Sequence, residues 1–231
     1  MKRFYRDAYV IATGEAFGIM LDNRPVLTPG RAVLSVPTVA LAEAIATEWC
    51  GQGETVEPRS MRLTGLANAA VDRAAMDTQA FSTGLVRYAE TDLLFYCAEG
   101  PPELASAQAA AWNPILAWAE RCYGVTFAIT RGVIHVAQPP RTIATLTDAL
   151  EAIDPFRLAA LSPIVTIGGS LVGALALLAG AIGSDALWDA VTIDELWQES
   201  HWGIDAEALA TRAARRAEWD DAVRFLALLD A

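Results

Sequence analysis

One short segment holds the side chains that are best suited to chemistry. Glu195, Glu199, His201 and Asp205 combine three carboxylates with an imidazole. Such groups bind zinc or manganese, and a metal-bound water would make the segment the site of a small metal-dependent hydrolase. Gly203 predicts a helix end between His201 and Asp205, so the four side chains are not expected on one helical face. The hydrolase is therefore the alternative function, and stoichiometric metal in the purified protein would support it.

Other motifs of catalytic and nucleotide-binding sites are missing from the sequence. No G-x-G-x-x-G follows a predicted strand, and no G-x-x-x-x-G-K-[ST] is present. Glycines in residues 168–173 favour close helix packing over a phosphate site, and Ser170 lacks the second glycine of a nucleophile elbow. A serine triad would need His135 or His201, and the spacing nominates neither. We expect no catalytic residue, no cofactor and no metal.

The composition is that of an acidic globular protein. Among 231 residues, 17 Lys and Arg stand against 28 Asp and Glu, a formal net charge of −11, and 54% of the residues are hydrophobic. The acidic balance argues against a nucleic-acid partner, because neutralising phosphates requires surplus basic residues. Cys50, Cys97 and Cys122 form no CxxC pair, which favours a reducing compartment. The charged N-terminus leads into no apolar segment, so we expect no signal peptide.

Residues 158–184 carry no charge and are long enough to test as a membrane span. Pro163 and several glycines interrupt the stretch, and it has neither an aromatic belt nor a basic cluster at its ends. We therefore expect a buried central helix over residues 164–182 and not an integral membrane protein. A membrane-associated factor anchored through that helix is a further alternative, which carbonate extraction would test.

The order of the expected elements indicates an α+β fold. Short apolar runs separated by turn residues predict strands over residues 3–11, 16–21, 26–27 and 32–36, and helical spacing predicts a covering helix over 41–49. Later expected helices include one opened by Pro101 and Pro102 and closed near Gly124, then 142–153, 155–162, 164–182, 185–199 and 205–229, with a hairpin over 125–129 and 133–137. We therefore predict a small strand-rich domain, 1–58, and a larger helical domain, 59–231.

Two features near the C-terminus allow more than one interpretation. Trp197 and Trp202 lie among polar residues, a setting typical of interface hot spots, although residue type favours burial of each. The cluster Arg212, Arg215 and Arg216 is followed by acidic residues, which predicts a solvated helix face with local ion pairs.

Four segments together resemble a known family. They are residues 88–96 (YAETDLLFY), 41–49 (LAEAIATEW), 61–72 (MRLTGLANAAVD) and Gln198-x-x-x-Trp202-Gly203. In order and spacing they are similar to the F1-ATPase assembly chaperones that act on the ATP synthase alpha subunit, the "Atp-twelve" type. The similarity spans nearly the whole chain.

The resemblance implies a chaperone that is not an enzyme. Such proteins hold the newly made alpha subunit of the F-type ATP synthase until the beta subunit replaces them. Glu195 matches an acidic position on which family function is thought to depend, and Asp205 matches a second one. With Gln198 and Trp202 these residues are the expected partner-binding site. The implied location is the bacterial cytoplasm, or the mitochondrial matrix for eukaryotic relatives, and self-association stays open.

Overall fold

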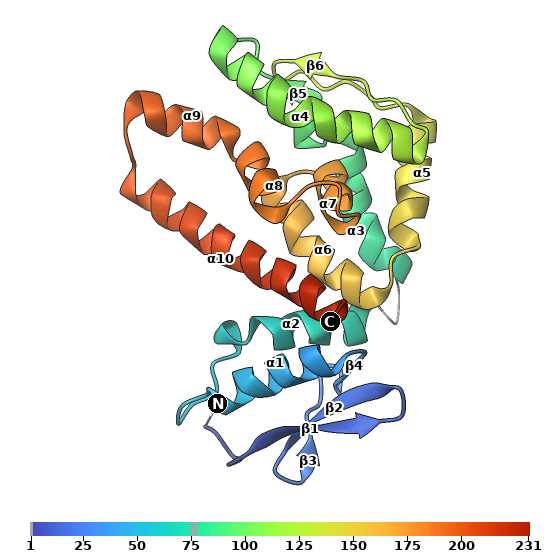
Figure 1. The fold of residues 1–231 in the computed structure, drawn as a ribbon, viewed down its shortest axis with the longest axis vertical. Helices are drawn as coiled ribbons and strands as arrows, with labels where there is room; N and C mark the ends of the chain where they lie inside the picture. The colour runs from blue at the N-terminus through green and yellow to red at the C-terminus, as the bar shows by residue number, and fades with distance from the viewer. Residues whose placement is uncertain (1, 75–77) are drawn as a thin grey trace. The chain divides into compact units, whose positions relative to one another are not determined.

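The protein, seen in a computed structural model, is described over residues 2–74 and 78–231 and divides into two compact units. Unit 1 consists of Met1–Phe81, Ile153–Ala160 and Ala217–Ala231, and unit 2 of Ser82–Ala152 and Leu161–Arg216. Strands of the larger sheet come first along the chain and most later elements are helices (Figure 1). The predicted α+β fold class is confirmed.

The sheet of unit 1 is built around one central strand. β1 (Ala8–Thr13) pairs antiparallel with β2 (Ala16–Leu21) through a two-residue turn in which Gly14 has φ 72°. This positive φ suits glycine and matches the twist of a tight hairpin. The short strands β3 (Arg24–Pro25) and β4 (Ser35–Val36) both pair with β2. The turn residues of the sequence thus divide the first forty residues into the strands of one sheet.

Helix α1 (Val39–Cys50) covers one face of this sheet, as predicted. The Thr38 hydroxyl accepts a hydrogen bond from the Leu41 amide and caps the helix, which ends at Gly51. Leu41 and Ile45 are fully buried and belong to one core with Ile19 of β2. Burying such aliphatic side chains contributes about 2 kcal/mol each.

The Glu48 carboxylate of α1 organises the next helix. It accepts hydrogen bonds of 2.8 Å from the amides of Leu63 and Thr64, in the first turn of α2 (Arg62–Ala69). These amides have no partner within the helix, so the carboxylate caps α2 and attaches it to α1. The 3-10 turn η1 (Pro58–Ser60) precedes α2, and the π-helical turn η2 (Ala70–Ala74) follows it.

The division into units differs from the predicted domain boundary at residue 58. Phe225 and Leu229, far along the chain, are buried in the same core as the sheet and α1. The Thr38 hydroxyl also donates a hydrogen bond of 2.6 Å to the carbonyl of Leu228. Apolar side chains of the last helix thus complete the core of unit 1, and a boundary drawn along the chain misses that long-range contact.

The remaining elements are mostly helices, and they are α3 (Thr78–Glu90), η3 (Leu93–Phe95), β5 (Tyr96–Cys97), α4 (Pro102–Tyr123), β6 (Thr130–Arg131), α5 (Pro140–Glu151), α6 (Pro155–Gly168), α7 (Leu171–Leu178), α8 (Ser184–Val191), α9 (Ile193–Trp202) and α10 (Ala206–Leu229). Helix α4 begins after Pro101 and ends at Gly124, whose φ of 63° suits glycine, as predicted. Within unit 2 the indole of Trp112 is buried and donates a hydrogen bond of 2.8 Å to the carbonyl of Ala190.

The prediction of a single helix over residues 164–182 is wrong. Helix α6 continues through Pro163 to Gly168, the chain reverses at Gly169 (φ 65°), and the Ser170 hydroxyl caps α7. The buried carboxylate of Asp92 accepts hydrogen bonds from the amides of Val172 (2.9 Å) and Leu94 (3.0 Å). A left-handed glycine and two caps therefore end one helix and begin the next inside an uninterrupted apolar stretch.

Two further predictions about unit 2 are corrected. Residues 125–129 and 133–137 form no hairpin: β6 pairs in parallel with β5, and the Gln138 amide bonds both backbone groups of Ala128 at 2.8–2.9 Å. The helix expected over 185–199 is two helices, α8 and α9, which meet at Thr192.

The expectation of close helix packing is confirmed at Gly173, where an added Cβ would lie 2.7 Å from Leu187 Cδ1.

A search of the described helices for a membrane span gives a negative result. Within residues 2–74 and 78–231, no helix combines the length and the apolar character needed to cross a bilayer.

Candidate functional site

The candidate site lies in unit 2, where α9 and the first half of α10 are joined by a short turn. Helix α9 ends at Gly203, which has φ 88°, so the prediction of a helix end there is confirmed. The Asp205 carboxylate accepts a hydrogen bond of 2.8 Å from the Ala208 amide. Asp205 therefore caps α10 at the position where an acidic side chain is favoured by the helix dipole.

Ion pairs between the two helices hold α9 on α10. The Arg215 guanidinium donates hydrogen bonds to both carboxylate oxygens of Glu195, at 2.7 and 2.6 Å, and that of Arg212 donates to Glu199 at 2.7 Å. The hydrogen bond to Glu199 raises the pKa of Arg212. No side chain of α9 is fully buried. These charged contacts, and not an apolar core, are therefore a main attachment between the two helices.

This arrangement corrects the interpretation of the basic cluster as a solvated face with local ion pairs. Arg212 and Arg215 pair with Glu199 and Glu195 on another helix, and the Arg212–Glu199 side chains are only 13% and 19% exposed. Arg216 pairs with Asp185 at the start of α8. The sequence shows basic and acidic residues at helical spacing in both helices, but it contains no signal that matches one helix to the other.

A different side of α9 faces α4 and the β5 region. The buried amide of Gln108 in α4 donates to Asp194 of α9 at 2.7 Å and accepts from the Ala98 amide at 2.7 Å. On the same helix the rings of Trp197 and His201 stack with centroids 3.9 Å apart. Gln108 thus fixes α9 against α4, a positioning role that sequence reasoning missed because a lone glutamine inside a helix carries no signal.

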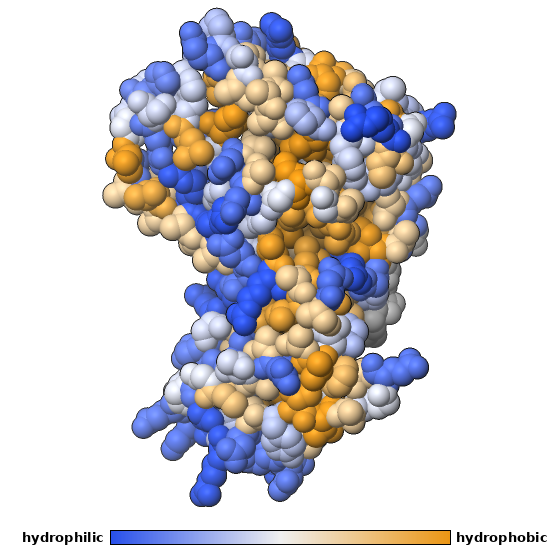
Figure 2. Space-filling view, in the orientation of Figure 1, coloured by the Kyte–Doolittle hydropathy of each residue, from blue (hydrophilic) through white to orange (hydrophobic). Residues whose placement is uncertain are grey.

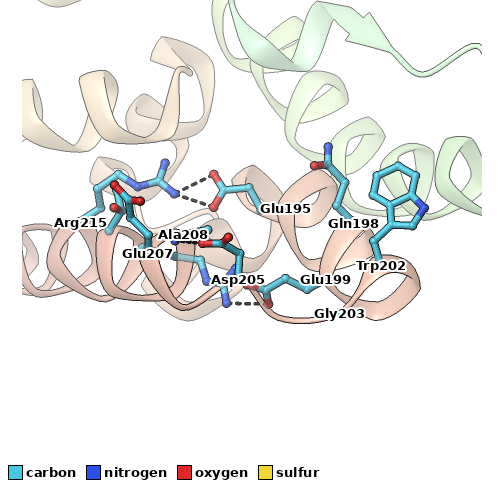
Figure 3. A pocket seen from close by; sticks show the side chains of 11 residues that line it. Glu195, Gln198, Glu199, Trp202, Gly203, Asp205, Glu207, Ala208 and Arg215 are labelled. Carbon is cyan, nitrogen blue, oxygen red and sulfur yellow. Dashed lines mark hydrogen bonds and ion pairs between the residues drawn. The ribbon is translucent and has the colours of Figure 1, made fainter.

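Gln198 and Trp202 lie between two hollows of the surface. The first, of about 460 Å³, is lined by all four residues of the predicted site, Glu195, Gln198, Trp202 and Asp205, and by the arginines of α10. The second, of about 540 Å³, is lined by residues of η3, β5 and α4 as well as by Gln198 and Trp202. Figure 3 shows these two side chains projecting from one side of α9, while Glu195 points toward Arg215. The structure therefore brings the four predicted residues together.

The surface beside these hollows is apolar. Trp202 is 76% exposed and Ile204 71% exposed, and Leu196 and Leu209 are exposed as well. Figure 2 shows hydrophobic residues gathered over the turn between α9 and α10. The prediction from residue type that Trp202 is buried is wrong, and Trp197 is half-buried. An exposed group of large apolar residues beside concave surface is typical of a protein–protein contact.

The same geometry bears on the residues of the predicted metal site. Glu195 and Glu199 are each paired with an arginine, Asp205 caps α10, and Nδ1 of His201 lies 2.9 Å from the carbonyl oxygen of Trp197. Over residues 2–74 and 78–231, no group of three His, Cys, Asp or Glu side chains is arranged to hold a metal ion. Glu195, Glu199 and Asp205 thus serve helix attachment and capping, while His201 stacks on Trp197 of the same helix.

Comparison with known proteins matches both the sequence and the fold. The family model of ATP12 chaperone protein matches residues 2–120. A point mutant of Paracoccus denitrificans Atp12p is 38% identical, with a TM-score of 0.92, over 99% of this chain and 97% of that chain. The crystal structure of Atp12 from the same organism is also 38% identical, with a TM-score of 0.91, over 99% and 98% of the two chains. The Atu1473 protein of Agrobacterium tumefaciens, a putative chaperone, gives 38% identity and a TM-score of 0.91 over 99% and 86%.

These matches, with the fold and the exposed apolar site, define the class of protein as a chaperone of ATP synthase assembly. The chain belongs to the ATP12 chaperone family. The resemblance found in the four sequence segments is confirmed.

Proposed function

We propose that the chain binds the free alpha subunit of the F-type ATP synthase and covers its subunit interface until the beta subunit replaces it. Membership of the ATP12 chaperone family supports the assembly role. The observation that carries the proposal is the exposure of Trp202. This residue is 76% exposed and lies between two hollows, on a helix that ion pairs attach to α10. A tryptophan in that setting offers a large apolar contact at low cost in side-chain entropy.

The physical need for such a contact lies in the unassembled subunit. A subunit interface that awaits its neighbour exposes an apolar patch, and patches of this kind cause aggregation. A chaperone must cover the patch with less affinity than the native neighbour, so that exchange favours assembly. A small site with one dominant aromatic anchor suits this requirement better than a large apolar interface would.

The four site residues have two roles in this proposal. Gln198 and Trp202, which line both hollows, contact the alpha subunit. Glu195 and Asp205 are positioning residues, because the first pairs with Arg215 and the second caps α10. The chaperone transforms no substrate and acts in the bacterial cytoplasm. In support, the side chains that would serve a hydrolase are engaged in contacts within and between α9 and α10.

Pull-down with purified alpha subunit tests the proposal. The Trp202→Ala variant removes an exposed side chain, so we expect an unchanged melting temperature and recovery of alpha subunit reduced by at least about tenfold, the effect of a hot-spot residue. Ile129→Ala is the matched control, because Ile129 is an exposed apolar residue of unit 2 that lines neither hollow. Equal recovery with both variants would remove Trp202 from the site, and no recovery with the unaltered chain would refute the proposed function.

A further inference from the structure

Strand β1 is an edge strand with one unpaired side. Among the described residues, β1 pairs only with β2, which lies between β1 and the short strands β3 and β4. The amide of Asp22 donates to the carbonyl of Asp7 at 2.9 Å, immediately before the strand. In an antiparallel pair the bonded positions alternate, so Tyr9, Ile11 and Thr13 bond to β2. The backbone groups of Ala8, Val10 and Ala12 therefore point away from the sheet.

This unpaired edge is open along most of its length. Among the described residues, the Ala8 carbonyl accepts a long contact of 3.4 Å from the Cys50 thiol, while the outward groups of Val10 and Ala12 have no partner. The strand AYVIAT carries no proline and no charged residue, and it pairs with β2 without a bulge. Prolines, charged residues and bulges ordinarily protect an edge strand from pairing with another chain, and β1 has none of the three.

The face of the sheet opposite α1 is uncovered and largely apolar. Ala8, Val10 and Phe17 pack against the core on the α1 side, so Tyr9 and Ile11 lie on the other face, where they are 42% and 37% exposed. Side chains of an added strand would find an apolar surface beside them.

The charge around the sheet indicates what kind of segment fits. Residues 2–36 contain five Lys and Arg and three Asp and Glu, a net charge of +2, whereas the whole chain carries −11. Arg6 lies directly before β1, is exposed and forms no ion pair with a carboxylate in the described part of the chain. A second copy would bring two like-charged sheets together, while an acidic segment would be attracted.

We propose that β1 accepts an extended segment of a partner protein as an additional strand, and that this segment has alternating apolar residues and an acidic residue at the end that lies beside Arg6. Backbone hydrogen bonds to Val10 and Ala12 provide the attachment, and Tyr9 and Ile11 contact the apolar side chains of the segment. This surface belongs to unit 1, so it goes beyond the contact proposed at α9 and α10.

Hydrogen exchange by NMR on the full chain tests this docking site without the alpha subunit. The probe is a synthetic peptide of three Val-Thr repeats flanked by glutamates. We expect the peptide to slow exchange of the Val10 and Ala12 amides at least about tenfold, with little change at Tyr9 and Ile11, which are already bonded to β2. If the peptide does not slow amide exchange, or slows it elsewhere but not at Val10 and Ala12, the proposal is overturned. Slowing that depends on protein concentration without peptide would identify a second copy as the occupant and also overturn it.

A pair of variants at one position separates backbone pairing from other binding. Ala12→Pro removes an outward amide and leaves the ladder to β2 intact, so we expect peptide affinity to fall at least about tenfold. Ala12→Ser keeps the amide and should bind as the unaltered chain does. Should Ala12→Pro fail to fold, the double variant Tyr9→Ser and Ile11→Ser removes the apolar contacts instead, and undiminished binding to it would refute their role. Equal affinity for a peptide with lysines in place of the glutamates would refute the acidic preference.

Discussion

Reversing the charge of Glu195 should detach α9 from α10 and so weaken capture of the alpha subunit. In the structure the Glu195 carboxylate receives two hydrogen bonds from Arg215, and the two side chains are 41% and 34% exposed. A half-exposed pair of this kind contributes about 1 kcal/mol. Glu195→Lys removes that attraction and places a second cation beside Arg215, where like charges about 4 Å apart repel by roughly 1–4 kcal/mol near a protein surface.

The expected result is a shift of α9 toward its detached state. With at least about 2 kcal/mol lost in total, the equilibrium between attached and detached α9 changes by at least roughly 30-fold. The fold of unit 2 should persist, because no side chain of α9 is fully buried. Hydrogen exchange of the α9 amides measures the detachment, and pull-down with purified alpha subunit measures capture.

A charge-swap variant decides between positioning and direct contact. Glu195→Arg combined with Arg215→Glu restores an ion pair of opposite polarity, so a positioning role predicts recovery of both slow exchange and capture. Recovery of slow exchange without capture would show that the carboxylate itself contacts the alpha subunit, which would refute the positioning role. Unchanged capture by Glu195→Lys would remove Glu195 from the site altogether.

Two further predictions concern the stability of unit 2. Burial raises the pKa of Asp92 to about 6, against hydrogen bonds from the amides of Val172 and Leu94 that lower it. Because the folded state then binds more protons than the unfolded state between about pH 4 and 6, this group's contribution to the free energy of unfolding should fall as pH rises through that range. Urea titrations should show that decline relative to Asp92→Asn, and parallel pH profiles of the two proteins would contradict it. Gly173→Ala should cost about 1–3 kcal/mol by urea unfolding, because the added Cβ would lie 2.7 Å from Leu187 Cδ1. Unchanged stability would mean that the Leu187 side chain moves aside freely.

Local signals in the sequence predict the ends of several helices correctly. Gly51 ends α1, Pro101 and Gly124 bound α4, and Gly203 ends α9. The ends at Gly124 and Gly203 use the positive φ that glycine allows, and the start of α4 uses the restraint of proline, effects that act within a few residues. The helical and strand periodicities likewise predict the covering helix and the strands β1 and β2.

Contacts between distant parts of the chain account for what the sequence does not reveal. The break at Gly169 is stabilised by Asp92, nearly eighty residues earlier, and the core of unit 1 is completed by Phe225. In the candidate site the sequence indicates Glu195, Gln198, Trp202 and Asp205 by resemblance, but not the arginines that pair across to α9. Matching charges on two helices requires knowledge of their packing, which periodicity does not contain.

The most direct test of the proposed function is an exchange experiment with three purified proteins. Size-exclusion chromatography of this chain with free alpha subunit should give a complex, and added beta subunit should release the chain as a separate peak while alpha and beta elute together. Absence of the first complex would contradict recognition of the alpha subunit. A complex that persists when the beta subunit is added would contradict the claim that the chain covers a subunit interface only until assembly.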